Sequence, residues 1–156
     1  MKMINKMIGP VQIYYSGKLT ARKFIPGIAW FFILLVLLCI PGSELPKASD
    51  WLEKIYFDKW VHIGLFGVLA ILFMAPVLAA HPPLMKKWTY IIFIASGVIL
   101  WGLITEFIQH YFIAGRSFDM FDWMADTCGV IIAVYLSRHF FLTTGSSFSG
   151  RFRAKT

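Results

Sequence analysis

Three long stretches without Asp, Glu, Lys or Arg constrain what this chain can fold into. They run from Phe24 to Ser43, from Trp60 to Met85 and from Trp88 to Thr105. About 20 apolar residues, rising about 1.5 Å each, cross the roughly 30 Å hydrocarbon core of a bilayer. With 58% hydrophobic and 15% charged residues, the composition excludes an ordinary soluble domain. Each stretch therefore predicts a transmembrane helix.

A fourth span is predicted less directly than the other three, because it must include charged residues to be long enough. The remaining uncharged stretch, Thr127 to Ser137, is too short to cross a bilayer alone. Extending it from Phe121 to Leu142 gives adequate length but takes in Asp122, Asp126 and Arg138. Arg138 lies near one end, where its long side chain can reach the interface, whereas the aspartates are too short to do so. A re-entrant or interfacial helix is the competing interpretation.

Short connections between the spans predict antiparallel neighbours. The expected fold class is all-α, an integral membrane antiparallel four-helix bundle. We expect a basic cytoplasmic leader at residues 1–23, a four-span membrane domain at 24–142 and a mobile, Gly/Ser-rich cytoplasmic tail at 143–156. No small-residue cleavage pattern follows the first apolar stretch, so it is interpreted as a retained span rather than a signal peptide.

The link before the second span contains apolar residues at helical spacing, namely Trp51, Leu52, Ile55, Tyr56 and Phe57. This spacing predicts a short amphipathic helix lying on the outer membrane surface. Such a helix would bring the residues that follow it to the mouth of the second span.

Basic residues are distributed unevenly between the two sides of the predicted bundle. The leader, the loop between the second and third spans, and the tail together hold 11 of the 15 Lys and Arg residues. The positive-inside rule therefore places both termini in the cytoplasm. Topology and anionic membrane lipids explain the net charge of +7, and no motif indicates a nucleic-acid partner.

Small residues predict where helices pack closely. Ala125, Gly129 and Ala133 recur every four residues on one face of the fourth span, and Gly64 and Gly67 lie near the start of the second. Small residues at this spacing let the backbones of membrane helices approach each other.

Nine polar side chains fall at the outward end of the predicted bundle, although they are far apart in the sequence. They are Asp58, Lys59 and His62 at the start of the second span, Glu106 and Gln109 at the end of the third, Arg116 and Asp119 in the following loop, and Asp122 and Asp126 at the start of the fourth. Randomly scattered surface charges would not share one depth.

Asp126 is the most constrained of these residues, since it lies about 7–8 Å inside the predicted fourth span. A carboxylate facing lipid costs about 2.5 kcal/mol or more, so this side chain should point into the bundle and have a partner. Arg116, Lys59 and His62 are the candidate partners.

A structural role is the alternative to a functional site. In that interpretation the polar residues form buried ion pairs, such as Glu106 with Arg116, that hold the outer ends of three helices together. Buried ion pairs stabilise proteins weakly compared with apolar packing, so we favour a site.

The spacing of the polar residues resembles the pattern of the VanZ-like family. The pattern is Asp58-Lys59-x-x-His62, then Glu106-x-x-Gln109, then Gly115-Arg116, then Asp119-x-x-Asp122-x-x-x-Asp126-x-x-Gly129. The namesake of this family is associated with low-level resistance to the lipoglycopeptide antibiotic teicoplanin, and the resemblance implies that the protein lies in the bacterial cytoplasmic (inner) membrane with the polar site at its outer face. The resemblance implies Asn at the position of Asp126, so this chain departs from the pattern and carries one more negative charge there.

The first functional hypothesis is an enzyme that acts at the outer leaflet on a lipid-linked or amphiphilic compound of the cell envelope. His62, oriented by Asp58, would be the general base or nucleophile, and Glu106 or Asp122 would be the second acid or base. The predicted substrate-binding residues are Lys59, Gln109, Arg116, Asp119 and Asp126, of which the two cations would hold a phosphate or carboxylate.

No cofactor is predicted from a motif. A variant of the first hypothesis has Glu106, Asp122 and Asp126 binding a divalent cation, with His62 as a further ligand. Three acids and a histidine are enough ligands, although no metal-binding motif is matched.

Two alternatives involve no chemical turnover. One is a binding or structural membrane protein whose polar cluster recognises an anionic headgroup or a drug. The other is a proton-coupled carrier, which is disfavoured because Arg138 is the only charged residue near the inner half of the later spans. The sequence leaves open whether the chain is an enzyme and what its oligomeric state is.

Overall fold

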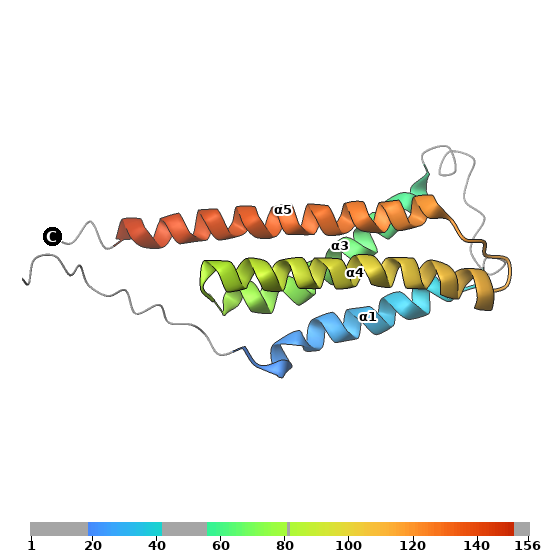
Figure 1. Cartoon of the computed structure of the whole chain (residues 1–156), viewed down its shortest axis with the longest axis horizontal. Helices are drawn as coiled ribbons and strands as arrows, with labels where there is room; N and C mark the ends of the chain where they lie inside the picture. The colour runs from blue at the N-terminus through green and yellow to red at the C-terminus, as the bar shows by residue number, and fades with distance from the viewer. Residues whose placement is uncertain (1–18, 42–55, 81, 152–156) are drawn as a thin grey trace, which may run out of the picture.

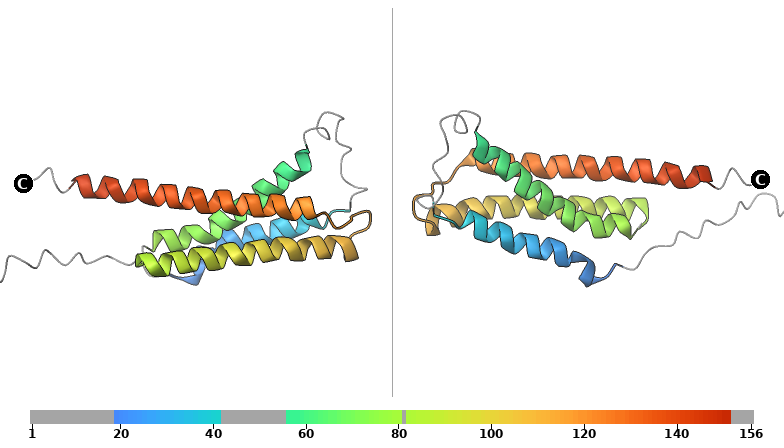
Figure 2. Two further views of the ribbon diagram at one scale, coloured as in Figure 1. Left: turned by 45° about the horizontal axis from the view of Figure 1, so that its top comes forward. Right: turned by 180° about the vertical axis from the view of Figure 1, so that it is seen from behind.

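The computed structural model describes residues 19–41, 56–80 and 82–151. A 3-10 turn, Ala21–Phe24, leads into α1 (Ile25–Leu38), which is followed by α3 (Phe57–Ala79), α4 (Leu84–Phe112) and α5 (Met120–Arg151). The helices run up and down beside one another, as both views of the ribbon show (Figures 1 and 2). The predicted all-helical bundle is confirmed.

Four segments of the described chain are long and apolar enough to cross a membrane: Ala21–Leu38, Phe57–Ala79, Met85–Phe112 and Met120–His139. Large apolar side chains project outward from them, including Val36, Phe93 and Ile131, which are 67%, 79% and 59% exposed. A soluble monomer rarely exposes apolar side chains on this scale, whereas lipid accommodates them. The chain is a multi-pass membrane protein with four spanning helices.

The core lies where the inward faces of the helices meet. It contains Leu34, Leu38, Phe66, Leu69, Ala70, Met74, Ile91, Val98, Val130 and Ala133. Two tryptophans connect neighbouring helices through hydrogen bonds. The Trp30 indole donates to the Leu65 carbonyl at 3.0 Å, and the Trp123 indole donates to the Ile99 carbonyl at 3.1 Å. The two indole hydrogen bonds therefore hold α1 against α3 and α5 against α4.

The closest approach of two helices is between α3 and α5, at Gly67 and Gly129. A Cβ on Gly67 would lie 3.2 Å from the Gly129 carbonyl oxygen, and a Cβ on Gly129 would overlap the Ile63 carbonyl oxygen. The small-residue stripe on the fourth span therefore packs as expected. Gly64 differs, because it is exposed and a Cβ there would meet no atom within 4 Å. Its place on the helix turns it away from the contact that Gly67 makes.

Two differences from the sequence-based expectations concern boundaries. α5 continues to Arg151, so residues 143–151, assigned to the tail, are helical in the structure, and the predicted mobility of the tail stays a prediction. The predicted amphipathic helix falls almost entirely outside the described residues. Within them, Tyr56 adopts a left-handed backbone conformation (φ 51°) and α3 begins directly after it, at Phe57.

Candidate functional site

One end of the bundle holds the predicted polar residues. There α1 and α4 end while α3 and α5 begin (Figure 1). α3 contributes Asp58, Lys59 and His62, α4 contributes Glu106 and Gln109, the connecting loop contributes Arg116 and Asp119, and α5 contributes Asp122 and Asp126. The up-down order of the helices is what brings these distant segments to the same end.

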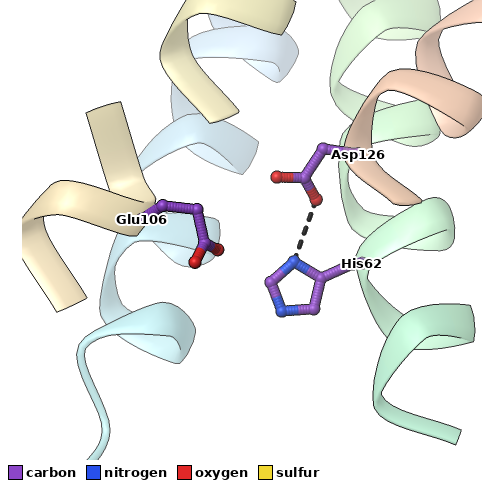
Figure 3. A group of neighbouring side chains, drawn as sticks. All are labelled: His62, Glu106 and Asp126. Atoms are coloured by element: carbon purple, nitrogen blue, oxygen red, sulfur yellow. Dashed lines mark hydrogen bonds and ion pairs between the residues drawn. The ribbon is translucent and has the colours of Figure 1, made fainter. Parts of the chain in front are cut away.

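The innermost part of this end is a group formed by His62, Glu106 and Asp126, which we call the buried triad. Their exposed fractions are 4%, 0% and 0%. Nδ1 of His62 lies 2.9 Å from Oδ1 of Asp126. Figure 3 shows the Glu106 carboxylate on α4 facing the imidazole from the opposite side. One potential ligand atom from each residue lies within 4.8 Å of the others. The deep carboxylate of α5 therefore points into the bundle, as predicted, and its partner is His62.

The two carboxylates of the triad are incompletely satisfied. Oε2 of Glu106 accepts a hydrogen bond from the backbone N–H of Asp119 at 3.0 Å. Within the described part of the chain, Oε1 of Glu106 and Oδ2 of Asp126 are buried and have no hydrogen-bond partner. Most buried polar atoms in proteins have a partner, because leaving one without costs about 1–3 kcal/mol or more when the group is charged. These two oxygens are the main anomaly of the site.

Above the triad, Lys59 forms the centre of a second cluster. Its ammonium lies 2.8 Å from Asp58, 2.6 Å from Asp119 and 2.5 Å from Asp122. The Lys59 side chain is 20% exposed, so this cluster forms the rim between the buried triad and the surroundings. One cation shared by three carboxylates leaves an excess of negative charge at this end.

Asp119 lies in the loop just outside the membrane-spanning segments, and it connects the rim to the triad. Its carboxylate accepts a hydrogen bond from Lys59, and its backbone N–H donates to Glu106. The Lys59 ammonium lowers the pKa of Asp119 below its usual range, and a hydrogen bond from the Phe121 backbone N–H at 2.8 Å acts in the same direction. Asp119 is therefore ionised at neutral pH and holds the loop in place.

Two pairings considered from the sequence are corrected by the structure. His62 is not oriented by Asp58, which points outward with a 59% exposed side chain and pairs with Lys59. The partner of His62 is Asp126, because the first turns of α3 and α5 lie side by side. Glu106 does not pair with Arg116, since among the described residues no ion pair involves Arg116. Nε of Arg116 is buried without a hydrogen-bond partner among the described residues, and Glu106 instead accepts a hydrogen bond from the Asp119 backbone N–H.

Gln109 and Asp122 take positions other than those the sequence favoured. The Gln109 amide donates to the Leu38 carbonyl at 3.0 Å, which fixes the end of α4 to the end of α1. Asp122 belongs to the rim through Lys59, while its second oxygen lies 3.9 Å from Nε2 of His62. Gln109 thus makes a contact between helices and its role in binding stays a prediction, while Asp122 lies between the rim and the triad.

Gly102 belongs to the site but was not singled out from the sequence. A Cβ at this position would lie 2.8 Å from Oδ2 of Asp126, so the missing side chain leaves room for that carboxylate. The Thr105 hydroxyl donates to the Gly102 carbonyl at 2.7 Å in the same turn. The available signal was the spacing, since Gly102 precedes Glu106 by four residues and shares its helix face.

The arrangement combines a histidine held by a carboxylate with a second carboxylate across from it. Such a set can accept or donate a proton, or can bind a cation through one nitrogen and two oxygens. The rim adds an ammonium group that three aspartates already surround, so an anionic ligand would have to displace one of them. All of these groups lie at one end of the bundle.

Comparison with known proteins agrees with the geometry. The model of the VanZ/LLP1 family matches residues 10–142, which include all four membrane spans and every polar residue of the site. No curated protein and no solved structure matches the chain. Because the family model covers most of the sequence, the chain belongs to the VanZ/LLP1 family.

Proposed function

We propose that the polar end of the bundle recognises or acts on an amphiphilic or lipid-linked compound of the bacterial cell envelope, and that it protects cells against lipoglycopeptides such as teicoplanin. The observation that carries this proposal is the pair of buried oxygens, Oε1 of Glu106 and Oδ2 of Asp126, without partners in the described structure. A network that served only to hold helices together would satisfy its acids. A site that receives a polar group leaves them available.

The orientation of the bundle supports an outward-facing site. The turn before α1, which holds Arg22 and Lys23, and the start of α4, which holds Lys86, lie at the end of the bundle opposite the start of α5 (Figure 1), and Arg138 shares a pocket with Trp88 near the start of α4. The positive-inside rule places that end in the cytoplasm. The triad and its rim then face the outer leaflet, where cell-envelope compounds and lipoglycopeptides are found.

The surroundings of the rim fit an amphiphile. The Lys59 side chain is 20% exposed and its ammonium is surrounded by three aspartates, so the rim suits the cationic or hydrogen-bonding part of a polar headgroup. Beside it, Phe57, Trp60 and Phe121 are 47%, 64% and 69% exposed. Aromatic side chains of this kind favour the membrane interface and can pack against an acyl chain or an apolar drug substituent. A compound with a charged head and an apolar tail would meet both.

The test is growth of a teicoplanin-sensitive bacterium that expresses the full chain. We expect the wild-type chain to raise the inhibitory teicoplanin concentration several-fold, and His62→Ala and Glu106→Ala to abolish the increase. His110→Ala is the matched control, because His110 lies one turn after Glu106 on the same helix but is exposed. Immunoblots of the membrane fraction establish that all variants are present at equal levels. Full protection by His62→Ala and Glu106→Ala at normal protein level would contradict the proposal.

A further inference from the structure

We infer that the buried triad of His62, Glu106 and Asp126 binds a divalent transition-metal ion. The inference rests on the proposed function in one respect, since both assign the same buried carboxylates to a ligand rather than to packing. The inference goes further by identifying the bound group as a metal ion. The sequence suggested a metal only in one variant of the first hypothesis, in which Asp122 was a fourth ligand.

The distances within the triad fit a single ion. One nitrogen or oxygen from each of the three residues lies within 4.8 Å of the others. Three atoms that surround one ion evenly at about 2.1 Å each lie at most about 3.6 Å apart. Side-chain movements of less than about 1 Å would therefore close the triad around an ion. The three residues come from α3, α4 and α5, so the site is held by three separate helices (Figure 3).

The electrostatics of the triad also call for a cation. Two carboxylates that are 0% exposed share a space bounded by apolar helices, and each has an oxygen without a partner among the described residues. Buried charges in proteins are paired or coordinate metals, because the loss of hydration is otherwise uncompensated. Lys59 is already shared by three aspartates at the rim. A divalent ion would balance the two carboxylates and supply a partner for both free oxygens.

The residues around the triad are arranged as those around a metal site commonly are. The backbone N–H of Asp119 holds one oxygen of Glu106 and leaves the other free. Oδ2 of Asp122 lies 3.9 Å from Nε2 of His62, which is the ring nitrogen that does not contact Asp126. Histidine ligands usually donate their second N–H to a carboxylate, which orients the ring and increases its basicity. Gly102 leaves the space next to Oδ2 of Asp126 open.

The ligand types indicate the class of ion. An imidazole with two carboxylates suits Zn²⁺, Mn²⁺ or Fe²⁺ better than Ca²⁺ or Mg²⁺, which prefer oxygen ligands alone. Three protein ligands leave at least one coordination position open, as in metal sites that bind a water or a substrate.

The first experiment uses the full-length wild-type chain, purified in detergent, stripped with EDTA and titrated with Co²⁺ as a spectroscopic substitute for the native ion. We expect one equivalent of Co²⁺ to bind and to give visible absorption bands. We also expect a higher midpoint of thermal unfolding with Co²⁺ than with EDTA, because an ion that binds only the folded state stabilises it. This comparison needs no variant.

Variants locate the ion. Glu106→Gln with Asp126→Asn keeps the shape of the site but removes both charges, and we expect it to lose the Co²⁺ bands. Asp122→Asn, which acts on the orientation of His62, should weaken binding about 10-fold. His110→Ala should bind like the wild type. Unchanged binding by the double variant would place the ion elsewhere and overturn the inference.

Failure of the metal inference can be told apart from failure of the proposed function. If the wild-type chain binds no Co²⁺ and shows no thermal shift, yet His62→Ala loses protection against teicoplanin, the metal inference is overturned while the proposed function stands. If the wild type binds one ion that the double variant loses, yet the double variant still protects cells, the metal inference is supported and the proposed function is wrong.

Discussion

Replacing Gly129 with alanine is expected to destabilise the bundle strongly, because its new methyl group would overlap a backbone atom. The Cβ would overlap the Ile63 carbonyl oxygen and lie 3.0 Å from the Gly67 nitrogen. Neither atom can rotate away as the end of a side chain can, so α3 and α5 must separate. Overpacking costs about 1–3 kcal/mol, and the rigid contact places this substitution at the upper end. The contact between His62 and Asp126 spans the same pair of helices and should be lost with it.

The measurement is the thermal unfolding midpoint of the detergent-purified chain, with Gly64→Ala as the matched control. Gly64 lies one turn before Gly67 on α3, and a Cβ there meets nothing within 4 Å. Gly64→Ala should leave the midpoint nearly unchanged. Equal midpoints for both substitutions would show that α3 and α5 do not cross as closely as described.

Replacing Lys59 with methionine is expected to lower the thermal unfolding midpoint of the chain, and this is the second large effect on stability. The substitution keeps the apolar stem but leaves Asp58, Asp119 and Asp122 around a space without their shared cation. Removing one partner of a buried ion pair costs about 3–5 kcal/mol. The loss here should be smaller, because the Lys59 side chain is 20% exposed and that of Asp58 is 59% exposed.

A double-mutant comparison separates charge from packing at Lys59. If repulsion between the freed aspartates causes the loss, adding Asp122→Asn to Lys59→Met should recover part of the unfolding midpoint. A double variant no more stable than Lys59→Met alone would show that the ammonium contributes through packing.

The dependence of stability on pH provides a second readout. Because Lys59 lowers the pKa of Asp119 in the folded state, the stability that this pair contributes is present above the ordinary Asp pKa of about 3.9. It is lost as the pH falls through the lowered pKa. The free energy of unfolding of Lys59→Met should therefore fall less than that of the wild type when the pH is lowered from neutral to strongly acidic.

The sequence predicted the spans and the grouping of polar residues because both follow from the order of residues along the chain. Stretches without charge are as long as a bilayer requires, and alternating directions of the spans determine which residues share an end. The depth and burial of Asp126 also followed, since a carboxylate cannot face lipid at low cost. These conclusions need no knowledge of helix rotation.

The pairing of the polar residues could not be predicted in the same way. Asp58 and His62 share a helix face by spacing, but the close crossing of α3 and α5 at Gly129 brings Asp126 nearer to the ring. Rotations of neighbouring helices about their axes follow from packing across the whole core. For the same reason the role of Gly102 depends on a contact between α4 and α5 that its sequence neighbours do not reveal.

The central claim is that the buried triad serves a ligand rather than helix packing, and the variant carrying Glu106→Gln with Asp126→Asn tests it most directly. Each amide keeps the shape of the acid and one acceptor oxygen, replaces the other oxygen with an NH2 donor, and removes a buried charge. The decisive measurement is the inhibitory concentration of teicoplanin for cells that express this variant at the wild-type level. We predict a folded chain at least as stable as the metal-free wild type, with protection lost. Full protection by the same folded variant would contradict the proposal that the triad recognises or acts on the compound against which the chain protects.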